Sequence, residues 1–284
     1  MNTDNAFYMG TTHEICQDYA LSNSNSIAIS DGCSGSNNSD IGSRVLSIIA
    51  MNKITELDSL YSFEEKECIL LARPAIKMLG IPNECLDATL LLATSYKNSL
   101  EAICCGDGVI AIKTKDNDIF IINCAYTDSY PFFMNYLYGR NGRLKEWDTN
   151  HNKREVSLTL IKEDGSIIEI GKNLSSISRI SDFGILKILD NKIFIEIVDS
   201  DIIEHISIMS DGVHSFYETI KTNTSKYNKS ISYLEVIKEL LVFKIYNETF
   251  VKRRVNKFKK DCLKKNWGNA DDVSLATIYV GKKL

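Results

Sequence analysis

Two Ser-Asp-Gly triplets place a carboxylate at the end of a strand-like apolar run of this chain. Asp31 follows one such run and precedes Gly32, and Asp211 ends another run in the same way. Asp271 stands just before the last apolar run. Carboxylates that converge at strand ends suit hard divalent cations, which prefer oxygen ligands, and Gly32 could add its backbone carbonyl. One Asp-Gly pair alone predicts only a turn, so the metal interpretation requires that the aspartates meet.

Charge and composition exclude several classes of protein. The 284 residues include 33 Lys+Arg and 37 Asp+Glu, which gives a formal net charge of -4. This balance excludes a globally basic nucleic-acid binder, because no net positive field gathers phosphates. Hydrophobic residues make up 44% and charged residues 25% of the chain, as in ordinary globular proteins, so a disordered chain is excluded as well.

The cysteines and the opening segment indicate a compartment. The chain has 8 Cys but no Cys-x-x-Cys pair, which argues against a thiolate zinc site. The polar opening lacks the pattern of a secretory signal, and no run of about 18 apolar residues could cross a membrane. We therefore expect a cytoplasmic protein with free thiols and without a membrane partner.

The elements that must position the aspartates form many short strands, with helices early and late. Helical spacing predicts a helix over 41–57 and a second helix after Ser62, which would act as its N-cap. Pro74 should kink or interrupt that second helix. A third helical pattern covers 233–265. No Gly/Ser/Pro-rich tether divides the chain, so we expect one α+β domain over 1–284.

Turn sequences separate the predicted strands in the middle of the chain. Residues 106–108 (Gly-Asp-Gly) and 115–118 lie between apolar runs and are expected to form hairpin connections. Residues 163–165 give a third hairpin signal. Consecutive strands with short turns imply antiparallel pairing.

Residues 126–155 are aromatic with interleaved arginines. An aromatic helix that packs on a sheet is the simpler interpretation, and a nucleic-acid or peptide contact surface is the alternative. If the segment is an insert, we expect it to act in substrate choice or as a flap. The residues concerned are Tyr126, Tyr130, Phe132, Phe133, Tyr136, Tyr138, Arg140, Arg143, Trp147 and Arg154.

A basic face follows on the last predicted helix. A solvated face is the simpler interpretation, and docking of an acidic partner or a phosphorylated segment is the alternative. The cations are Lys252, Arg253, Arg254, Lys257, Lys259, Lys260, Lys264 and Lys265.

Six short blocks match the motifs of one family in type and in order. The blocks are Thr12-His13-Glu14-Ile15-Cys16-Gln17-Asp18, Ser30-Asp31-Gly32-Cys33-Ser34-Gly35, Asp87-Ala88-Thr89, Cys105-Gly106-Asp107-Gly108, Ser210-Asp211-Gly212-Val213 and Asp271-Asp272-Val273-Ser274. In this the chain resembles the metal-dependent protein phosphatase family (PPM/PP2C), in its bacterial branch, from about Tyr8 to Val280. The resemblance implies a central β-sandwich of two antiparallel sheets flanked by helices, in α-β-β-α layers.

The resemblance also implies two bound Mg²⁺ or Mn²⁺ ions at one end of the sandwich. Asp31 resembles the carboxylate that bridges the two metals. Gly32 would offer its carbonyl to the second metal, and Asp211 and Asp271 would complete the first. Asp107 resembles a ligand of a third, more weakly bound metal.

Other positions set the substrate chemistry and depart from the family pattern. Asp18 resembles the outer-sphere acid that orders water beside the metals. His13 stands where the family usually has a phosphate-binding Arg, so we expect it to bind substrate, to donate a proton to the leaving group, or merely to pack. Ser215 replaces an Asp of the third-metal site, Cys33 replaces the His of eukaryotic members, and Asp272 replaces the usual Asn.

The activity implied is hydrolysis of phosphoserine or phosphothreonine in proteins by a metal-activated water. The expected partners are a phosphorylated protein substrate and a cognate Ser/Thr kinase, with no nucleic acid. A catalytically weak or inactive relative that only binds phosphoproteins is the alternative. A metal-dependent nuclease would need a duplex-binding surface that the acidic balance does not supply.

Overall fold

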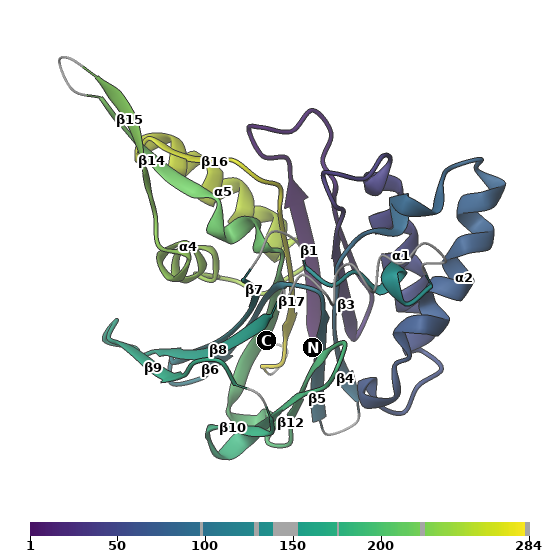
Figure 1. Cartoon of the computed structure of the whole chain (residues 1–284). Helices are drawn as coiled ribbons and strands as arrows, with labels where there is room; N and C mark the ends of the chain where they lie inside the picture. The colour runs from purple at the N-terminus through teal and green to yellow at the C-terminus, as the bar shows by residue number, and fades with distance from the viewer. Residues whose placement is uncertain (97–98, 128–130, 139–152, 175, 222–224, 282–284) are drawn as a thin grey trace.

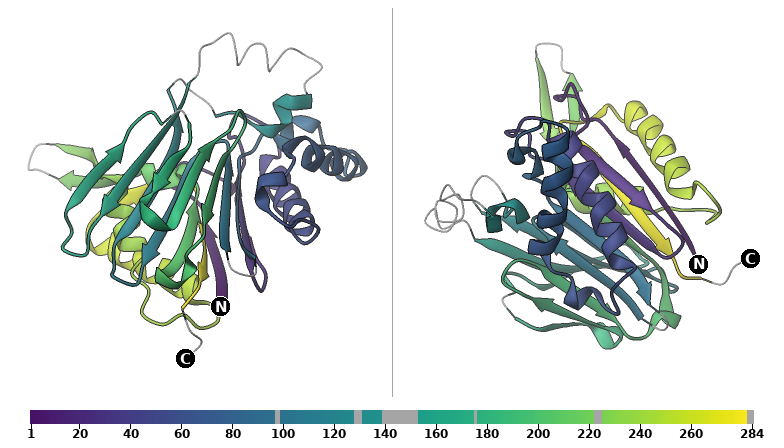
Figure 2. Two further views of the ribbon diagram at one scale, coloured as in Figure 1. Left: turned by 90° about the horizontal axis from the view of Figure 1, so that it is seen from below. Right: turned by 90° about the vertical axis from the view of Figure 1, so that its right-hand side faces the viewer.

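Two seven-stranded antiparallel sheets stack face to face in the computed structural model, with helices on both outer faces (Figures 1 and 2). The structure describes residues 1–96, 99–127, 131–138, 153–174, 176–221 and 225–281. The expected α-β-β-α sandwich is therefore confirmed. That the whole chain forms one domain stays a prediction.

The first sheet combines both ends of the chain with its middle. Its strand order is β1-β17-β13-β6-β7-β8-β9, and all neighbours are antiparallel. The strands are β1 (Asn2–Tyr8), β17 (Val273–Tyr279), β13 (Ile203–Met209), β6 (Gly108–Thr114), β7 (Ile119–Tyr126), β8 (Arg154–Ile161) and β9 (Ile167–Gly171). Because β13, β6 and β17 are neighbours, the connections at their ends lie close together.

The second sheet is built in the order β10-β11-β12-β5-β4-β3-β2, again with antiparallel neighbours. The strands are β10 (Ser178–Ile180), β11 (Gly184–Ile188), β12 (Ile193–Ile197), β5 (Ser99–Cys105), β4 (Leu90–Tyr96), β3 (Ser26–Asp31) and β2 (Asp18–Ser22). The β2–β3 hairpin forms one edge of this sheet, so residues at its open end can lie beside the first sheet.

Isoleucines from both sheets form the inner core. Ile110 and Ile206 of the first sheet and Ile29 and Ile195 of the second belong to one buried cluster. Each fully buried side chain of this type contributes about 1.5–3 kcal/mol of transfer free energy. Since successive strand residues face opposite sides, other residues of the same strands meet the outer helices.

The outer layers consist of amphipathic helices. The helices α1 (Ser39–Ile54) and α2 (Glu65–Met78) cover the second sheet, and α4 (Tyr233–Leu240) and α5 (Phe250–Lys264) cover the first (Figure 1). None of the helices in the described ranges is both long and apolar enough to cross a membrane.

A small third sheet has the order β15-β14-β16. Its strands are β14 (Phe216–Lys221), β15 (Lys226–Ser230) and β16 (Trp267–Asn269), and the β14–β15 hairpin projects from the body of the molecule (Figure 1). The sheet joins a segment that follows β13 to the segment that precedes β17. It therefore links the surroundings of Asp211 to those of Asp271.

The second helix begins later than the sequence predicts, and the assignment of Ser62 as its N-cap is wrong. Ser62 ends a short 3-10 helix, η1 (Leu60–Ser62), and its Oγ donates to the carbonyl of Ser59 at 2.8 Å. The helix α2 instead follows Glu64, which makes no side-chain cap. Ser62 stands two residues before Glu64, so its hydroxyl is not at the N-cap position of α2.

Pro74 neither interrupts α2 nor ends it. The residue lies inside the helix, which continues through Met78. Pro74 and Leu70 are both exposed, so water can satisfy the carbonyl at position 70 that lacks its usual N–H partner. The interruption that the sequence predicts at Pro74 is therefore absent, because Pro74 faces solvent.

Two further expectations need correction. The helical pattern over 233–265 divides into α4 and α5, with a connection at 241–249. Residues 106–108 do not close a hairpin, because β5 belongs to the second sheet and β6 to the first. This connection crosses between the sheets and so places Asp107 at the end of the sandwich. All eight cysteines are free, as expected.

Candidate metal centre

Asp18 and Asp31 lie directly across from each other where β2 begins and β3 ends. The register pairs their Cα positions, so both carboxylates emerge at the same end of the second sheet. Asp18 is 1% exposed, and the Ser210 hydroxyl donates to its Oδ2 at 2.7 Å. The hairpin therefore holds two carboxylates side by side at the sandwich end.

Three further aspartates reach the same place from the first sheet. Asp107 precedes β6, Asp211 begins the 3-10 helix η6 (Asp211–His214) after β13, and Asp271 precedes β17. These three side chains and Asp31 line one pocket of about 220 Å³. The full lining is His13, Gln17, Asp31, Gly32, Cys33, Ser34, Thr89, Asp107, Pro131, Phe133, Asp211 and Asp271.

Burial, together with mutual repulsion, raises the pKa values of these acids. The pKa of Asp31 lies well above its ordinary value, first because burial disfavours the charged form and then because Asp18 and Asp211 add negative charge. Burial, followed by the charge of Asp211, also raises the pKa of Asp107 and the pKa of Asp271. A cluster of this kind is unfavourable at neutral pH unless cations neutralise it.

The donor chemistry of the cluster fits divalent metals. Asp18 Oδ1 and Asp211 Oδ1 are buried and have no hydrogen-bond partner in the described structure. Buried, unpaired carboxylate oxygens are suitable ligands for Mg²⁺ or Mn²⁺. Within the described residues, no three His, Cys, Asp or Glu side chains converge closely enough to hold one ion. The carboxylates surround the pocket rather than meet at one point.

Asp31 is held in position by Thr89. The Thr89 side chain accepts from the Asp31 backbone N–H at 3.2 Å, and its own N–H donates to the Asp31 carbonyl at 2.9 Å. The Ser30 hydroxyl donates to the Thr89 carbonyl at 2.6 Å. Asp87, two residues before Thr89, accepts from Asn135 Nδ2 at 2.8 Å. The Asp87-Ala88-Thr89 block therefore holds Asp31 in place, and Thr89 itself lines the pocket.

Two glycines of the motifs are required by close packing. A Cβ atom on Gly32 would lie 2.6 Å from the carbonyl oxygen of Ser39, at the start of α1. A Cβ atom on Gly212 would lie 1.7 Å from the carbonyl oxygen of Asp272. Both distances are too short for any side chain, so these positions let the aspartate-bearing loops approach their neighbours.

Ser215 supports Asp271 rather than the pocket directly. Its Oγ accepts from the Asp271 backbone N–H at 3.1 Å and donates to the Gly212 carbonyl at 2.8 Å. The residue that stands in place of a family Asp therefore connects the loop of Asp211 to the loop of Asp271. Sequence reasoning did not find this role, because it depends on the pairing of β14 with β16.

His13 and Asp272 form an ion pair at the pocket. His13 Nδ1 lies 3.0 Å from Asp272 Oδ2, and Nε2 lies 3.5 Å from Asp271 Oδ1. The Asp272 carboxylate also accepts hydrogen bonds from the backbone N–H groups of Gly10 at 2.7 Å and Gln17 at 2.6 Å. Burial lowers the pKa of His13, but the contact with Asp272 and the nearby negative charges outweigh it and raise that pKa. The extra charge of Asp272 is therefore compensated locally.

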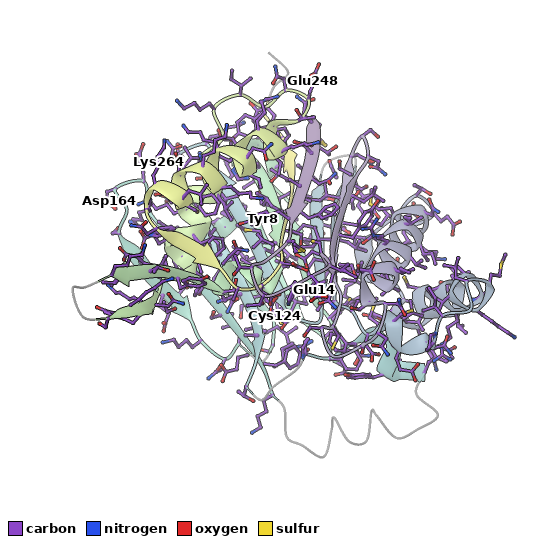
Figure 3. All side chains as sticks on the ribbon, turned by 90° about the horizontal axis from the view of Figure 1, so that it is seen from above. Tyr8, Glu14, Cys124, Asp164, Glu248 and Lys264 are labelled. Atoms are coloured by element: carbon purple, nitrogen blue, oxygen red, sulfur yellow. The ribbon has the colours of Figure 1, made fainter. Side chains whose placement is uncertain are left out.

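The loop that carries His13 lies at the end of the sandwich seen from above in Figure 3. Glu14, the next residue, lies near the middle of that view, and Asp164 of the β8–β9 turn lies at its periphery. The loop is fastened to β16 of the third sheet, because the N–H of Thr11 donates to the carbonyl of Asn269 at 3.0 Å. His13 is thus held over the carboxylates.

The aromatic segment contributes one wall of the pocket. Phe132, Phe133 and Tyr136 form a buried cluster beside Cys33, and Pro131 and Phe133 line the pocket. The described part contains a short 3-10 helix, η3 (Met134–Tyr138), instead of the expected longer helix. The residues Tyr130, Arg140, Arg143 and Trp147 lie outside the described residues.

The other histidines that the structure describes do not line the pocket. His205 is fully buried beside Phe243, and burial lowers its pKa to about 3. His214 Nε2 lies 3.0 Å from Asn123 Oδ1. His151 falls outside the described part of the chain.

Comparison with known proteins places the chain among phosphatases. The family model described as Protein phosphatase 2C matches residues 10–257. No curated protein matches the sequence significantly.

Several solved structures share the fold over nearly the full length. A bacterial serine phosphatase has 14% identity and a TM-score of 0.53, with 100% of both chains covered. Ser/Thr phosphatase Stp1 from Staphylococcus aureus has 13% identity and a TM-score of 0.53, over 99% of this chain and 96% of that one. MsPP from Mycobacterium smegmatis, in complex with cacodylate, has 11% identity and a TM-score of 0.50, over 99% of each chain. At these identities the likeness establishes the fold alone.

Proposed function

The chain belongs to the protein phosphatase 2C family, whose members are phosphoprotein phosphatases, and we propose that it uses divalent metals to hydrolyse phosphoserine and phosphothreonine in proteins. The observation that carries the proposal is the gathering of Asp31, Asp107, Asp211 and Asp271 from two different sheets around one pocket. Acids that repel one another in this way destabilise a fold, so their presence together favours a function for them.

Asp31, Asp211, Asp271 and the Gly32 carbonyl would hold two Mg²⁺ or Mn²⁺ ions, and Asp107 would contribute to a weaker third site. When bound, these ions would activate water for attack on phosphorus and would neutralise charge on the phosphoryl oxygens. Cation binding would also offset the burial and the repulsion that together raise the pKa values of Asp31 and Asp107.

His13 and Asp18 would serve the substrate and the water. The His13 ring lines the pocket, and its raised pKa favours an imidazolium that donates a hydrogen bond to a phosphate oxygen. The same ring would give a proton to the leaving alkoxide. Asp18 does not line the pocket but lies behind Asp31, fixed by Ser210, as suits an acid that orders water from outside the metal ligands.

The partners follow from this chemistry. The substrate would be a phosphorylated protein, and a Ser/Thr kinase would supply it. Nucleic acid is not an expected substrate, because the carboxylates around the pocket would repel a continuous phosphate backbone. The cytoplasmic location also stays a proposal.

One observation favours the alternative of a weakly active protein that only binds phosphoproteins. Both ring nitrogens of His13 lie within 3.5 Å of a carboxylate oxygen, so these carboxylates would compete with a phosphate for the ring. Calorimetry discriminates between the two functions, since binding of a phosphothreonine peptide without release of phosphate would support the alternative.

The direct test is hydrolysis of a phosphothreonine peptide in the presence of Mn²⁺. We expect turnover by the wild type, none after removal of metal by EDTA, and a loss of at least about a hundredfold in Asp31→Asn. The matched control is Asp164→Asn, which changes an exposed carboxylate on a distant turn and should leave the rate unchanged. Equal rates for wild type and Asp31→Asn would contradict the proposal.

A further inference from the structure

A second pocket lies at the start of α5, where the connection from α4 meets the helix. Its volume is about 190 Å³. The apolar walls are Val242, Phe243, Ile245 and Phe250. Val242 is 52% exposed and Ile245 is 59% exposed, so apolar surface stays open to solvent at this point. Such a hollow suits one apolar side chain of another molecule.

The polar residues that line this pocket are all cationic. None of the eight lining residues is acidic, and the polar ones are Lys244, Arg253, Arg254 and Lys257. Arg254 is held inside the fold, where its Nε donates to the Glu239 carbonyl at 2.9 Å. Lys244 and Lys257 are exposed, and neither forms an ion pair with any residue that the structure describes. Two uncompensated positive charges therefore face an apolar hollow.

The positive charge continues along α5. Arg253, Lys257, Lys260 and Lys264 follow one another at intervals of four, three and four residues, which places them on one side of the helix. All four are exposed. At a rise of about 1.5 Å per residue the stripe extends about 16 Å, the length of roughly five residues of extended peptide. Figure 3 shows the helix between Glu248 and Lys264.

We propose that this pocket and the basic stripe form a docking surface for an acidic peptide segment of a partner protein. An apolar side chain of the segment would occupy the pocket, and its carboxylates would pair with Lys257 and Lys260. Charge complementarity supports the choice, since the stripe is positive although the whole chain has a net charge of -4. The inference goes beyond the proposed phosphatase function, because none of these residues lines the pocket of the aspartates.

A protein segment fits this surface better than a membrane or a nucleic acid. A helix that lies on a membrane presents its apolar face to the lipid, whereas the apolar face of α5 is buried against the first sheet. Val242 and Ile245 line a hollow, whereas a surface that inserts into a membrane presents protruding apolar side chains. A nucleic acid would pair with the stripe but would leave the apolar pocket unused.

Fluorescence anisotropy of a labelled peptide tests the proposal with the full-length protein. The probe has six glutamates and one central phenylalanine. We expect saturable binding that weakens with added salt, and a loss of about fivefold or more when alanine replaces the phenylalanine or when Lys257→Glu reverses one charge. The double change Val242→Ala with Ile245→Ala should remove the preference for phenylalanine over alanine.

The matched control is Lys77→Glu, which reverses an exposed cation on α2, on the opposite outer layer. It should bind the probe like the wild type, and Lys257→Glu should hydrolyse p-nitrophenyl phosphate like the wild type. Equal binding of a hexalysine analogue, or equal binding by Lys257→Glu and wild type, would overturn the proposal. Binding to phosphatidylserine vesicles without binding to the peptide would overturn it as well.

Discussion

At the scale of single residues, the aspartates of the pocket oppose stability, which favours the functional role that we propose for them. Asp31 lies across from Asp18, and the negative charge of Asp211 repels its carboxylate as well. In the absence of metal, each carboxylate makes ionisation of the others less favourable. The same carboxylates would supply oxygen ligands to divalent cations that bind in the pocket. Stability and activity should therefore respond oppositely to removal of one charge.

Asp31→Asn should stabilise the metal-free protein while it abolishes metal-dependent hydrolysis. The amide has nearly the volume of the carboxylate but no charge, so the free energy of unfolding should rise by about 1 kcal/mol or more. Urea denaturation in EDTA measures this change. A destabilised Asp31→Asn would show that the carboxylate has a structural role instead.

Asp272→Asn should weaken substrate binding more than catalysis. The Asp272 carboxylate accepts hydrogen bonds from two backbone N–H groups and contacts His13. An asparagine amide has only one acceptor oxygen and no charge, so it cannot accept from both N–H groups and also stabilise the protonated His13 ring. We expect a lower pKa of His13 and a several-fold rise in KM for a phosphothreonine peptide, with a smaller change in kcat. The pH profile of kcat/KM should shift to lower pH, and an unshifted profile would exclude this role for Asp272.

At the scale of elements, sequence patterns identified most strands but not every connection. The apolar runs that end at Asp31 and before Asp211 are strands, and those motifs located the pocket. The Gly-Asp-Gly sequence at 106–108 looks like a hairpin locally, and only the pairing partners of β5 and β6 show that it crosses between sheets. The capping pattern at Ser62 was also misleading, because Ser62 ends η1 and Glu64 is the residue that precedes α2.

Pro74→Ala should stabilise α2. The alanine restores the backbone N–H at position 74, which can donate to the carbonyl of Leu70, and Pro in a helix interior costs about 3 kcal/mol relative to Ala. The greater freedom of the unfolded chain offsets about 1 kcal/mol of this, so we expect a net gain of about 2 kcal/mol. Thermal unfolding measures the change, and Lys77→Ala on the same helix should differ from wild type by less than about 0.5 kcal/mol. A lower Tm for Pro74→Ala would show that the proline ring packs favourably.

At the scale of the whole molecule, the pocket exists because two sheets end at the same place. Asp18 and Asp31 come from the second sheet, and Asp211 and Asp271 from the first. Sequence spacing alone could not show this convergence, since the four residues span most of the chain. The hydrogen bonds of Ser215 and Asp272 that hold the loops around the pocket were not predictable either. Each of these residues connects loops that meet only after the sheets have packed.

The metal-free protein should lose stability as pH rises. The pKa of Asp31 and that of Asp107 are raised above their ordinary value of 3.8, and the pKa of Asp18 is raised to about 7 by burial first. Groups with raised pKa values favour the folded state below the unfolded pKa, and this contribution is lost as pH rises through the folded pKa. Denaturation in EDTA should therefore show lower stability at pH 7 than at pH 5.

Metal should reverse this trend. Because Mn²⁺ competes with protons for the carboxylates, the increase in Tm on adding Mn²⁺ should grow from pH 5 to pH 7. An increase in Tm that does not depend on pH would indicate that the ions bind somewhere other than these aspartates.

The number of Mn²⁺ ions bound per chain tests the central claim most directly. Isothermal titration calorimetry at neutral pH, repeated in buffers of different ionisation enthalpy, gives both the stoichiometry and the number of protons released. We predict about two ions per wild-type chain, with release of protons from the aspartates, and weakened binding in Asp31→Asn but not in Asp164→Asn. A folded wild-type protein that binds no Mn²⁺, or that binds it equally well as Asp31→Asn, would contradict the account.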